Sequence, residues 1–214
     1  MVAERSGIDL VRDRSADRRN GQSARRRPKD RKVQIVRAAA RAFSERGYYP
    51  VGVDEIAAEV GISGPALYRH FANKYALLVA AAEEGARHLL AAARDADRPD
   101  LDPEERLDKL ITAVAEHTIE VRREAGLYRW EGRYLERADR ARVKALYDDI
   151  NATFGEPVAQ LRPEASPADI ALLAAGVLSV IGSISAHRTS LAGSRLLSLL
   201  RDMSWAIVRT ELPP

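Results

Sequence analysis

The chain has 214 residues, a formal net charge of +3 and no cysteine, so disulfides, thiolate zinc sites and cysteine nucleophiles are excluded. Its length allows one or two domains with a full core. The longest apolar candidate, residues 170–186, is rich in Gly, Ser and Ala and falls short of a membrane span of about eighteen apolar residues. We therefore expect a soluble, cytoplasmic protein with no membrane partner.

An arginine-rich arm opens the chain. Residues 1–80 carry 16 Lys and Arg against 9 Asp and Glu, whereas residues 81–214 carry 18 against 22. Most of the excess positive charge precedes the first expected helix, in a segment with almost no apolar residues that could form a core. Residues 1–29 are therefore expected to be a disordered basic arm. No apolar segment follows the charges, so the arm is not a secretory signal.

Residues 53–74 are predicted to form two short helices joined by a tight turn. Ile56 and Ala57 share one face of the first helix, and Gly61 suits the left-handed conformation that ends it. An apolar helix over residues 33–46 precedes the pair, so three helices can pack together here.

The second helix of the pair has strong start signals. Ser63 can cap it and Pro65 fits its first turn. Leu67 and Phe71 are four residues apart and point toward the first helix. The residues on its other faces carry a hydroxyl, a guanidinium and an imidazole: Tyr68, Arg69 and His70. Such a helix suits the major groove of DNA, although any helical hairpin with a solvated outer face shows the same pattern.

Roughly residues 32–81 contain five short sequence elements with characteristic spacing between them. They are Gly47-Tyr48, Val53-Asp54-Glu55-Ile56-Ala57, Gly61-Ile62-Ser63, Leu67-Tyr68-Arg69-His70-Phe71, and Lys74 with Leu77-Leu78. Their joint spacing resembles the DNA-binding domain of the TetR (tetracycline-repressor) family. The resemblance implies an all-α fold of about nine helices. It divides the chain into the arm, a helix-turn-helix domain over residues 30–80, and an effector-binding and dimerisation domain over residues 81–214.

Two departures from the family pattern weaken the expected DNA contacts. Val51 and Gly52 stand where the family usually has Thr or Ser, so a hydroxyl that caps the helix and touches a phosphate is missing. Gly64, Pro65 and Ala66 stand where many relatives carry Lys or Arg, then Gly, then Thr. Base reading there is reduced to backbone and apolar contacts.

An arginine-rich tail beside a helix-turn-helix can follow the phosphate backbone or enter the minor groove, or it can be a solubilising tail. We favour a contact with double-stranded DNA. The residues expected to touch it are Arg25, Arg26, Arg27, Gly52, Ser63, Gly64, Pro65, Ala66, Tyr68, Arg69, His70 and Lys74.

The rest of the chain has helical periodicity throughout, and no segment alternates with period two, so no sheet is expected. A break at residues 97–103 and another at 162–167 separate the elements. The expected helices are 74–96, one opening at 103 or 104, one or two over 127–137 and 139–161, then 168–187 and 194–210, with a kink at Gly126.

The last two expected helices carry more apolar surface than one side of a monomer core needs. Small residues such as Gly176 line the first, and residues such as Leu197 and Trp205 surround the second. Either the pair is an internal core, or it forms a homodimer through a four-helix contact. With the family resemblance we favour the dimer, because two-fold symmetry matches a palindromic operator.

A small-molecule effector site is expected among the middle helices, with apolar walls and a few polar groups. The candidate contacts are His117, Trp130, Arg133, Tyr134, Tyr147 and Asn151. Each has a structural alternative: the histidine as a hydrogen-bonded core residue, the aromatics as packing residues, and the arginine as a surface ion-pair partner. If Arg133 lined the site, an anionic or acyl-type ligand would be plausible.

No catalytic residue, metal site or cofactor is expected, because the four histidines lack metal-ligand spacing and no nucleophile elbow or phosphate loop occurs. The resemblance implies a repressor released from its operator by an effector. The alternatives are an architectural or effector-independent DNA-binding protein and a helical enzyme or small-molecule carrier.

Overall fold

The computed structural model describes residues 28–186 and 189–213, and within these it contains nine α-helices, two short 3₁₀ helices and no strand. The elements are α1 (Pro28–Arg46), α2 (Val53–Glu59), α3 (Gly64–Tyr68), α4 (Lys74–Ala96), α5 (Pro103–Glu120), α6 (Leu127–Glu131), η1 (Gly132–Tyr134), α7 (Arg137–Leu161), α8 (Pro167–Gly182), η2 (Ser183–Ser185) and α9 (Gly193–Val208). The all-α prediction is confirmed. The helix α1 begins at Pro28 and so takes in the last two residues assigned to the basic arm. The predicted contacts Arg25, Arg26 and Arg27 lie outside the described residues.

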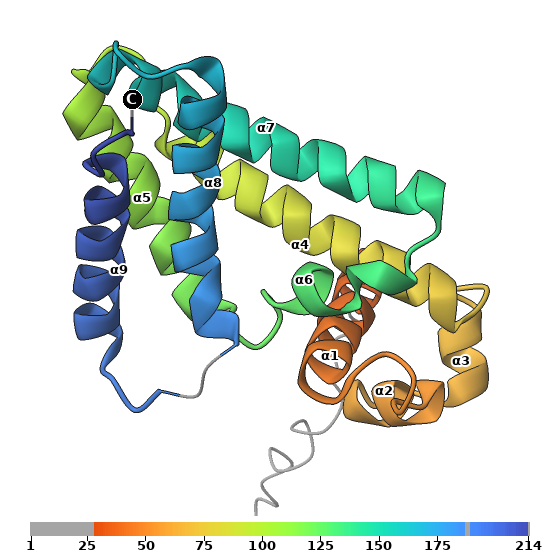
Figure 1. Cartoon of the computed structure of the whole chain (residues 1–214). Helices are drawn as coiled ribbons and strands as arrows, with labels where there is room; N and C mark the ends of the chain where they lie inside the picture. The colour runs from red at the N-terminus through yellow and green to blue at the C-terminus, as the bar shows by residue number, and fades with distance from the viewer. Residues whose placement is uncertain (1–27, 187–188, 214) are drawn as a thin grey trace, which may run out of the picture.

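The helices α1, α2 and α3 gather at one end of the molecule and pack on the first turns of α4 (Figure 1). Their core is apolar and fully buried at its centre, which includes Phe43, Ile56, Leu67 and Leu77. Packing of their apolar faces on this core stabilises the two short helices despite their length.

Hydrogen bonds at the helix ends agree with the sequence-based expectations. Gly61 has φ +68°, which closes α2 in the left-handed region. The Ser63 hydroxyl accepts a hydrogen bond from the Ala66 amide at 3.4 Å. At the start of α2 the Gly52 amide donates to the Glu55 carboxylate at 3.0 Å. Gly52 has no side chain to complete a reciprocal capping box, so α2 starts without the usual side-chain cap.

The long helices α4 and α7 lie side by side, and α5, α8 and α9 pack together at the opposite end from α3 (Figure 1). Their shared core includes Leu110, Ile111, Ile150, Phe154 and Val177. The helix α4 contributes to both cores without a break: Leu77 and Ala86 lie in the first, and Leu90 and Ala93 in the second.

The segment around Gly126 differs from the expected kinked helix. The helix α5 ends at Glu120, a turn follows, and α6 is only five residues long before η1. A Cβ atom on Gly126 would lie 2.9 Å from the Trp130 ring, so the glycine allows a close approach of that ring to the backbone.

Candidate DNA-binding surface and effector cavity

The end of α3 and the residue after it present two of the three side chains that the sequence predicted for the outer face, whereas His70 is only partly exposed. The side chain of Tyr68 is 50% exposed, and Arg69 is exposed beside it. On the opposite face Leu67 and Phe71 are buried, with Phe71 only 5% exposed. One face of the helix therefore packs on the core, and the other face is exposed, as a helix that enters the major groove of DNA requires.

The N-terminal tip of α3 is partly covered. Ser63 and Pro65 are exposed and Ala66 is half-buried, but Gly64 is buried. A Cβ atom on Gly64 would overlap the Asp54 Oδ1 atom, so the carboxylate occupies the space that a side chain would need. A direct DNA contact by Gly64 would require the Asp54 side chain to turn away.

Lys74, another predicted contact, is engaged within the protein. Its ammonium donates to the Tyr49 carbonyl at 3.1 Å and lies 4.6 Å from the centre of the Tyr48 ring. Burial lowers the pKa of Lys74. The exposed Tyr49 ring beside it was missed by the sequence reasoning, although two adjacent tyrosines after the Gly47 turn were a signal that could have drawn attention to it.

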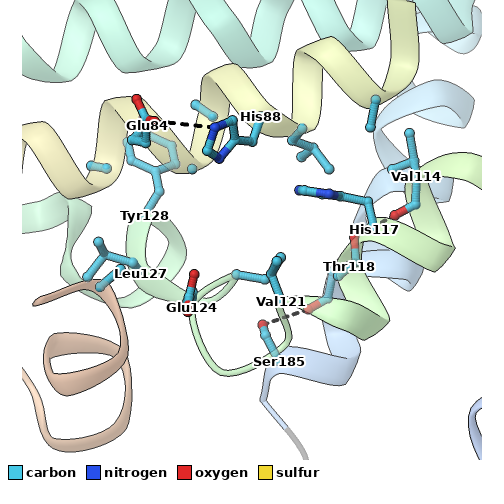
Figure 2. Close-up of a pocket in the computed structure, with 18 of the residues that line it drawn as sticks. Glu84, His88, Val114, His117, Thr118, Val121, Glu124, Leu127, Tyr128 and Ser185 are labelled. Atoms are coloured by element: carbon cyan, nitrogen blue, oxygen red, sulfur yellow. Dashed lines mark hydrogen bonds and ion pairs between the residues drawn. The ribbon is translucent and has the colours of Figure 1, made fainter. Parts of the chain in front are cut away.

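A cavity of about 700 Å³ opens between α1, α4, α5, α6, α7 and α8 (Figure 2). Its walls combine alanine, valine and leucine side chains with a few polar groups. Of the six predicted ligand contacts, two line this cavity: His117 and Tyr147.

His117 projects into the cavity from α5, and His88 projects from α4 on the other side (Figure 2). Burial, followed by the nearby His88, lowers the pKa of His117, so this imidazole is neutral at neutral pH. The Tyr147 ring stacks on Tyr128 with 4.9 Å between ring centres, and burial raises the pKa of Tyr147 to about 12. Tyr147 therefore offers a phenol and not a phenolate.

The other four predicted contacts do not line the cavity. Tyr134 packs instead against Tyr49, with 4.8 Å between ring centres, and Arg133 lies over the Tyr134 ring in an exposed position. Trp130 is partly exposed. For Tyr134 the physical reason is that the α-helix gives way to a 3₁₀ turn at Gly132, so Tyr134 no longer shares a face with Trp130, four residues earlier.

Asn151 lies on α7 and turns its amide back on its own helix. Its Nδ2 atom donates to the Tyr147 carbonyl at 2.9 Å, and its buried Oδ1 atom has no partner within the part of the chain that the structure describes. Asn151 thus contacts the backbone of a cavity residue without reaching the cavity itself.

The sequence reasoning missed several polar residues of the cavity wall, which come from α4, the end of α5, the turn after it, α6 and η2: Glu84, His88, Thr118, Glu124, Tyr128 and Ser185. Tyr128 lies only two residues before the predicted contact Trp130. Glu124 carried no usable signal, because its direction depends on the geometry of the turn between α5 and α6.

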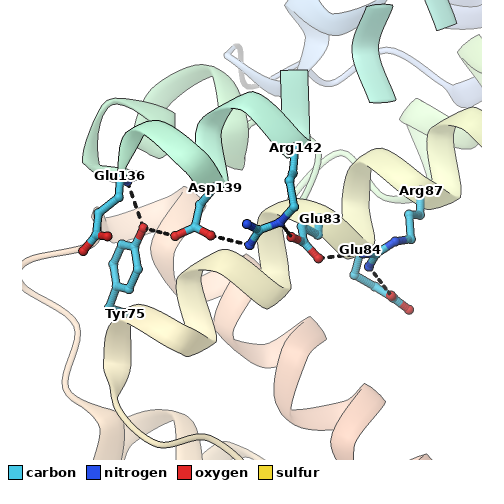
Figure 3. A network of polar contacts seen from close by, with 7 residues as sticks. All are labelled: Tyr75, Glu83, Glu84, Arg87, Glu136, Asp139 and Arg142. Carbon is cyan, nitrogen blue, oxygen red and sulfur yellow. Dashed lines mark hydrogen bonds and ion pairs between the residues drawn. The ribbon is translucent and has the colours of Figure 1, made fainter. Parts of the chain in front are cut away.

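A polar network joins α4 to the start of α7 (Figure 3). The Tyr75 hydroxyl, near the start of α4, bonds the Asp139 carboxylate of α7 and accepts from the Glu136 amide at 2.8 Å. Arg142 bonds Asp139 and donates to Glu83 at 3.0 Å. The network fixes the start of α7 to the segment of α4 that leaves the helix-turn-helix end.

Acidification should destabilise the protein through His117. Because the folded-state pKa of His117 is lowered, only the unfolded chain gains a proton as pH falls through about 6.5, the ordinary value for histidine. The free energy of unfolding should therefore fall over that range, and less steeply in a His117→Gln variant, as urea titrations at several pH values would show. Glu124, whose pKa is raised by burial, acts with the opposite sign. An identical pH dependence in both proteins would contradict the assignment.

Within the described ranges no cluster of three His, Cys, Asp or Glu side chains is arranged to hold a metal ion. The helical segment Pro167–Ser185 is long and apolar enough to span a membrane by length and composition alone, with 28% of its apolar window buried in this chain. Core helices of soluble proteins meet the same criteria, so this is weak evidence for a membrane span.

Comparisons with known proteins agree with this geometry. Residues 35–81 match the family described as bacterial regulatory proteins, tetR family. The HTH-type transcriptional activator FasR of Mycolicibacterium smegmatis is 38% identical over 89 residues, which is 41% of this chain and 41% of FasR. The match therefore spans less than half the length of this curated relative.

Solved structures extend the similarity over most of the chain. A tetR-family regulatory protein from Rhodococcus RHA1 has a TM-score of 0.70 and 26% identity, over 81% of this chain and 96% of that one. The structure of AibR in complex with isovaleryl coenzyme A and operator DNA has a TM-score of 0.69 and 22% identity, over 81% and 97%. The matched helix-turn-helix segment over residues 35–81, together with the fold shared with the tetR-family protein from Rhodococcus RHA1 over 81% of this chain, places this chain in the tetR family of transcriptional regulators.

Proposed function

We propose that this protein is a dimeric repressor that binds a palindromic operator and leaves it when a small-molecule effector fills the cavity. One observation supports the coupling most directly. Val36, Arg37 and Ala40 of α1 form part of the cavity wall, so an effector would touch the DNA-binding domain itself. A ligand with different affinities for two orientations of that domain would shift the balance between them.

The proposed dimer interface is the outer face of α8 and α9. Leu172 is 72% exposed, and Met203 and Leu199 are 48% and 40% exposed. The two helices pack side by side at the end of the molecule opposite α3 (Figure 1). A two-fold contact through this face would cover these side chains and could set two α3 helices about 34–36 Å apart, one turn of DNA.

The DNA contacts belong to this proposal as well. Within the assigned domain over residues 30–80, the exposed face of α3 would enter the major groove. The arm over residues 1–29, through Arg25, Arg26 and Arg27, would add affinity for the phosphate backbone. The domain over residues 81–214 would bind the effector and the partner copy in the cytoplasm.

The direction of regulation has a second candidate. FasR is named as an activator, and its similarity to this chain lies within 89 residues. The alternative is therefore an activator whose affinity for DNA changes when its effector binds. Deleting the gene should raise transcription of the target genes for a repressor and lower it for an activator.

Footprinting of the full-length protein on the DNA upstream of its own gene tests the proposal. We expect a protected palindrome at physiological salt. Protection of operator and random DNA alike, with a steep loss of affinity as salt rises, would instead indicate an architectural protein. Turnover of a small molecule without any DNA binding would indicate an enzyme.

A further inference from the structure

Of the four acidic residues that line the cavity, Glu124 has the least exposed side chain, at 23%. It lies in the turn between α5 and α6, and Figure 2 shows it on the cavity wall below Tyr128. Its only ion-pair partner among the described residues is Arg41, whose Nη1 atom lies 3.4 Å from its Oε1 atom. Burial raises the pKa of Glu124 in spite of this contact. The carboxylate is therefore partly desolvated and only weakly compensated.

Arg41 is held mainly by another acid. Its Nη2 atom lies 2.6 Å from the Glu59 Oε1 atom in the last turn of α2, and this bond is the main reason why the pKa of Arg41 is raised. The guanidinium thus links the first helix of the helix-turn-helix to the cavity wall, with the closer contact on the DNA-binding side.

The other charges inside the cavity leave no strong site for an anion. Glu84 lies 3.3 Å from the His88 Nε2 atom, and His117 is neutral at neutral pH. Two arginines also line the cavity, Arg37 and Arg129, but both are exposed at its edge.

Two hydroxyls of the wall are committed as donors to helix carbonyls. Thr118 donates to the Val114 carbonyl at 2.7 Å, and Ser185 donates to the Gly182 carbonyl at 2.8 Å. Their lone pairs remain available to accept from a hydrogen-bond donor on the ligand.

Resting on the proposed function, we propose that the effector is an apolar molecule with a protonated amine, whose ammonium pairs with Glu124 in competition with Arg41. If Arg41 lost its contact with Glu124, it would remain paired with Glu59 alone. The last turn of α2 would then no longer be linked through Arg41 to the turn after α5. The same pairing would disfavour a carboxylate or a phosphate at this position, because like charges repel in a partly desolvated site.

Three probes with the same tail and different head groups test the charge: decylammonium, decanol and decanoate. Isothermal titration calorimetry on the full-length protein should give the tightest binding for decylammonium. In Glu124→Gln this preference over decanol should fall by about 10-fold or more, since a hydrogen bond to a charged group is lost, while decanol binding stays unchanged. The matched control is Glu116→Gln, an exposed acid on α5 outside the cavity, which should behave like the wild type. In Arg41→Met, where the competing cation is gone, decylammonium should bind more tightly.

Tighter binding of decanoate, no binding of any probe at millimolar concentration, or a preference for decylammonium that persists in Glu124→Gln would overturn the proposal. So would unchanged decylammonium affinity in Arg41→Met. Footprinting of the same preparation separates this failure from that of the proposed function. A protected palindrome that decanoate releases would overturn the amine assignment alone, whereas absence of any protected palindrome would overturn the repressor itself.

Discussion

Replacing Phe71 by alanine should destabilise the protein by about 3–5 kcal/mol, whereas Tyr68→Ala should leave the free energy of unfolding nearly unchanged. Phe71 is 5% exposed and closes the core between α1, α2 and α3, so its loss leaves a cavity. Lys32 lies 5.4 Å from the centre of the Phe71 ring and would lose that contact as well. Urea unfolding of both full-length variants gives the comparison.

In DNA binding the order should be reversed: at a temperature where both variants are folded, Tyr68→Ala should bind the operator more weakly than Phe71→Ala. Tyr68→Ala removes a side chain from the exposed face of α3 and should weaken operator affinity, while folded Phe71→Ala retains that face. Equal losses of unfolding free energy in the two variants would show that the inner and outer faces of α3 are wrongly assigned.

Replacing Leu172 or Met203 by glutamate should convert the proposed dimer to a monomer and weaken operator binding by about 100-fold or more, because the two half-sites are no longer held together. Both side chains are exposed in the single chain, so the monomer should remain folded. Sedimentation velocity measures the mass, circular dichroism the fold, and gel shift the operator affinity.

A matched control is Ala145→Glu, which adds the same charge to an exposed position on α7 outside the proposed interface. It should remain dimeric and bind the operator like the wild type. A dimer that persists in both Leu172→Glu and Met203→Glu would place the interface on another surface. A monomeric variant that binds the operator with full affinity would contradict the need for two linked half-sites.

Elements with strong local signals were predictable from the sequence. The helix α4 has the predicted bounds, 74–96, and its Asn73 cap accepts a hydrogen bond from the Ala76 amide at 2.7 Å. The break before α5 was predictable from its two prolines and its acidic residues, and Asp102 caps the helix that follows. Both cases depend on contacts within one turn of helix, which neighbouring residues determine.

Buried charge was not predictable in the same way. Arg106 is almost fully buried and donates to Asp97 at 2.7 Å and to Glu156 at 2.8 Å. In the sequence it is one arginine of an amphipathic helix and does not differ from exposed arginines such as Arg94. Its partners lie 9 and 50 residues away, and only the packing of α5 against α7 brings the more distant one within reach.

By itself the sequence determined the helix-turn-helix, its caps and the two faces of α3, because periodicity and capping act over a few residues. Only the tertiary structure decided which side chains reach the cavity. The change from α6 to a 3₁₀ turn moved Trp130 and Tyr134 off a common face, and the turn after α5 brought Glu124 to Arg41. A side chain's direction after a turn depends on every preceding backbone dihedral and on distant packing partners, and helical spacing specifies neither.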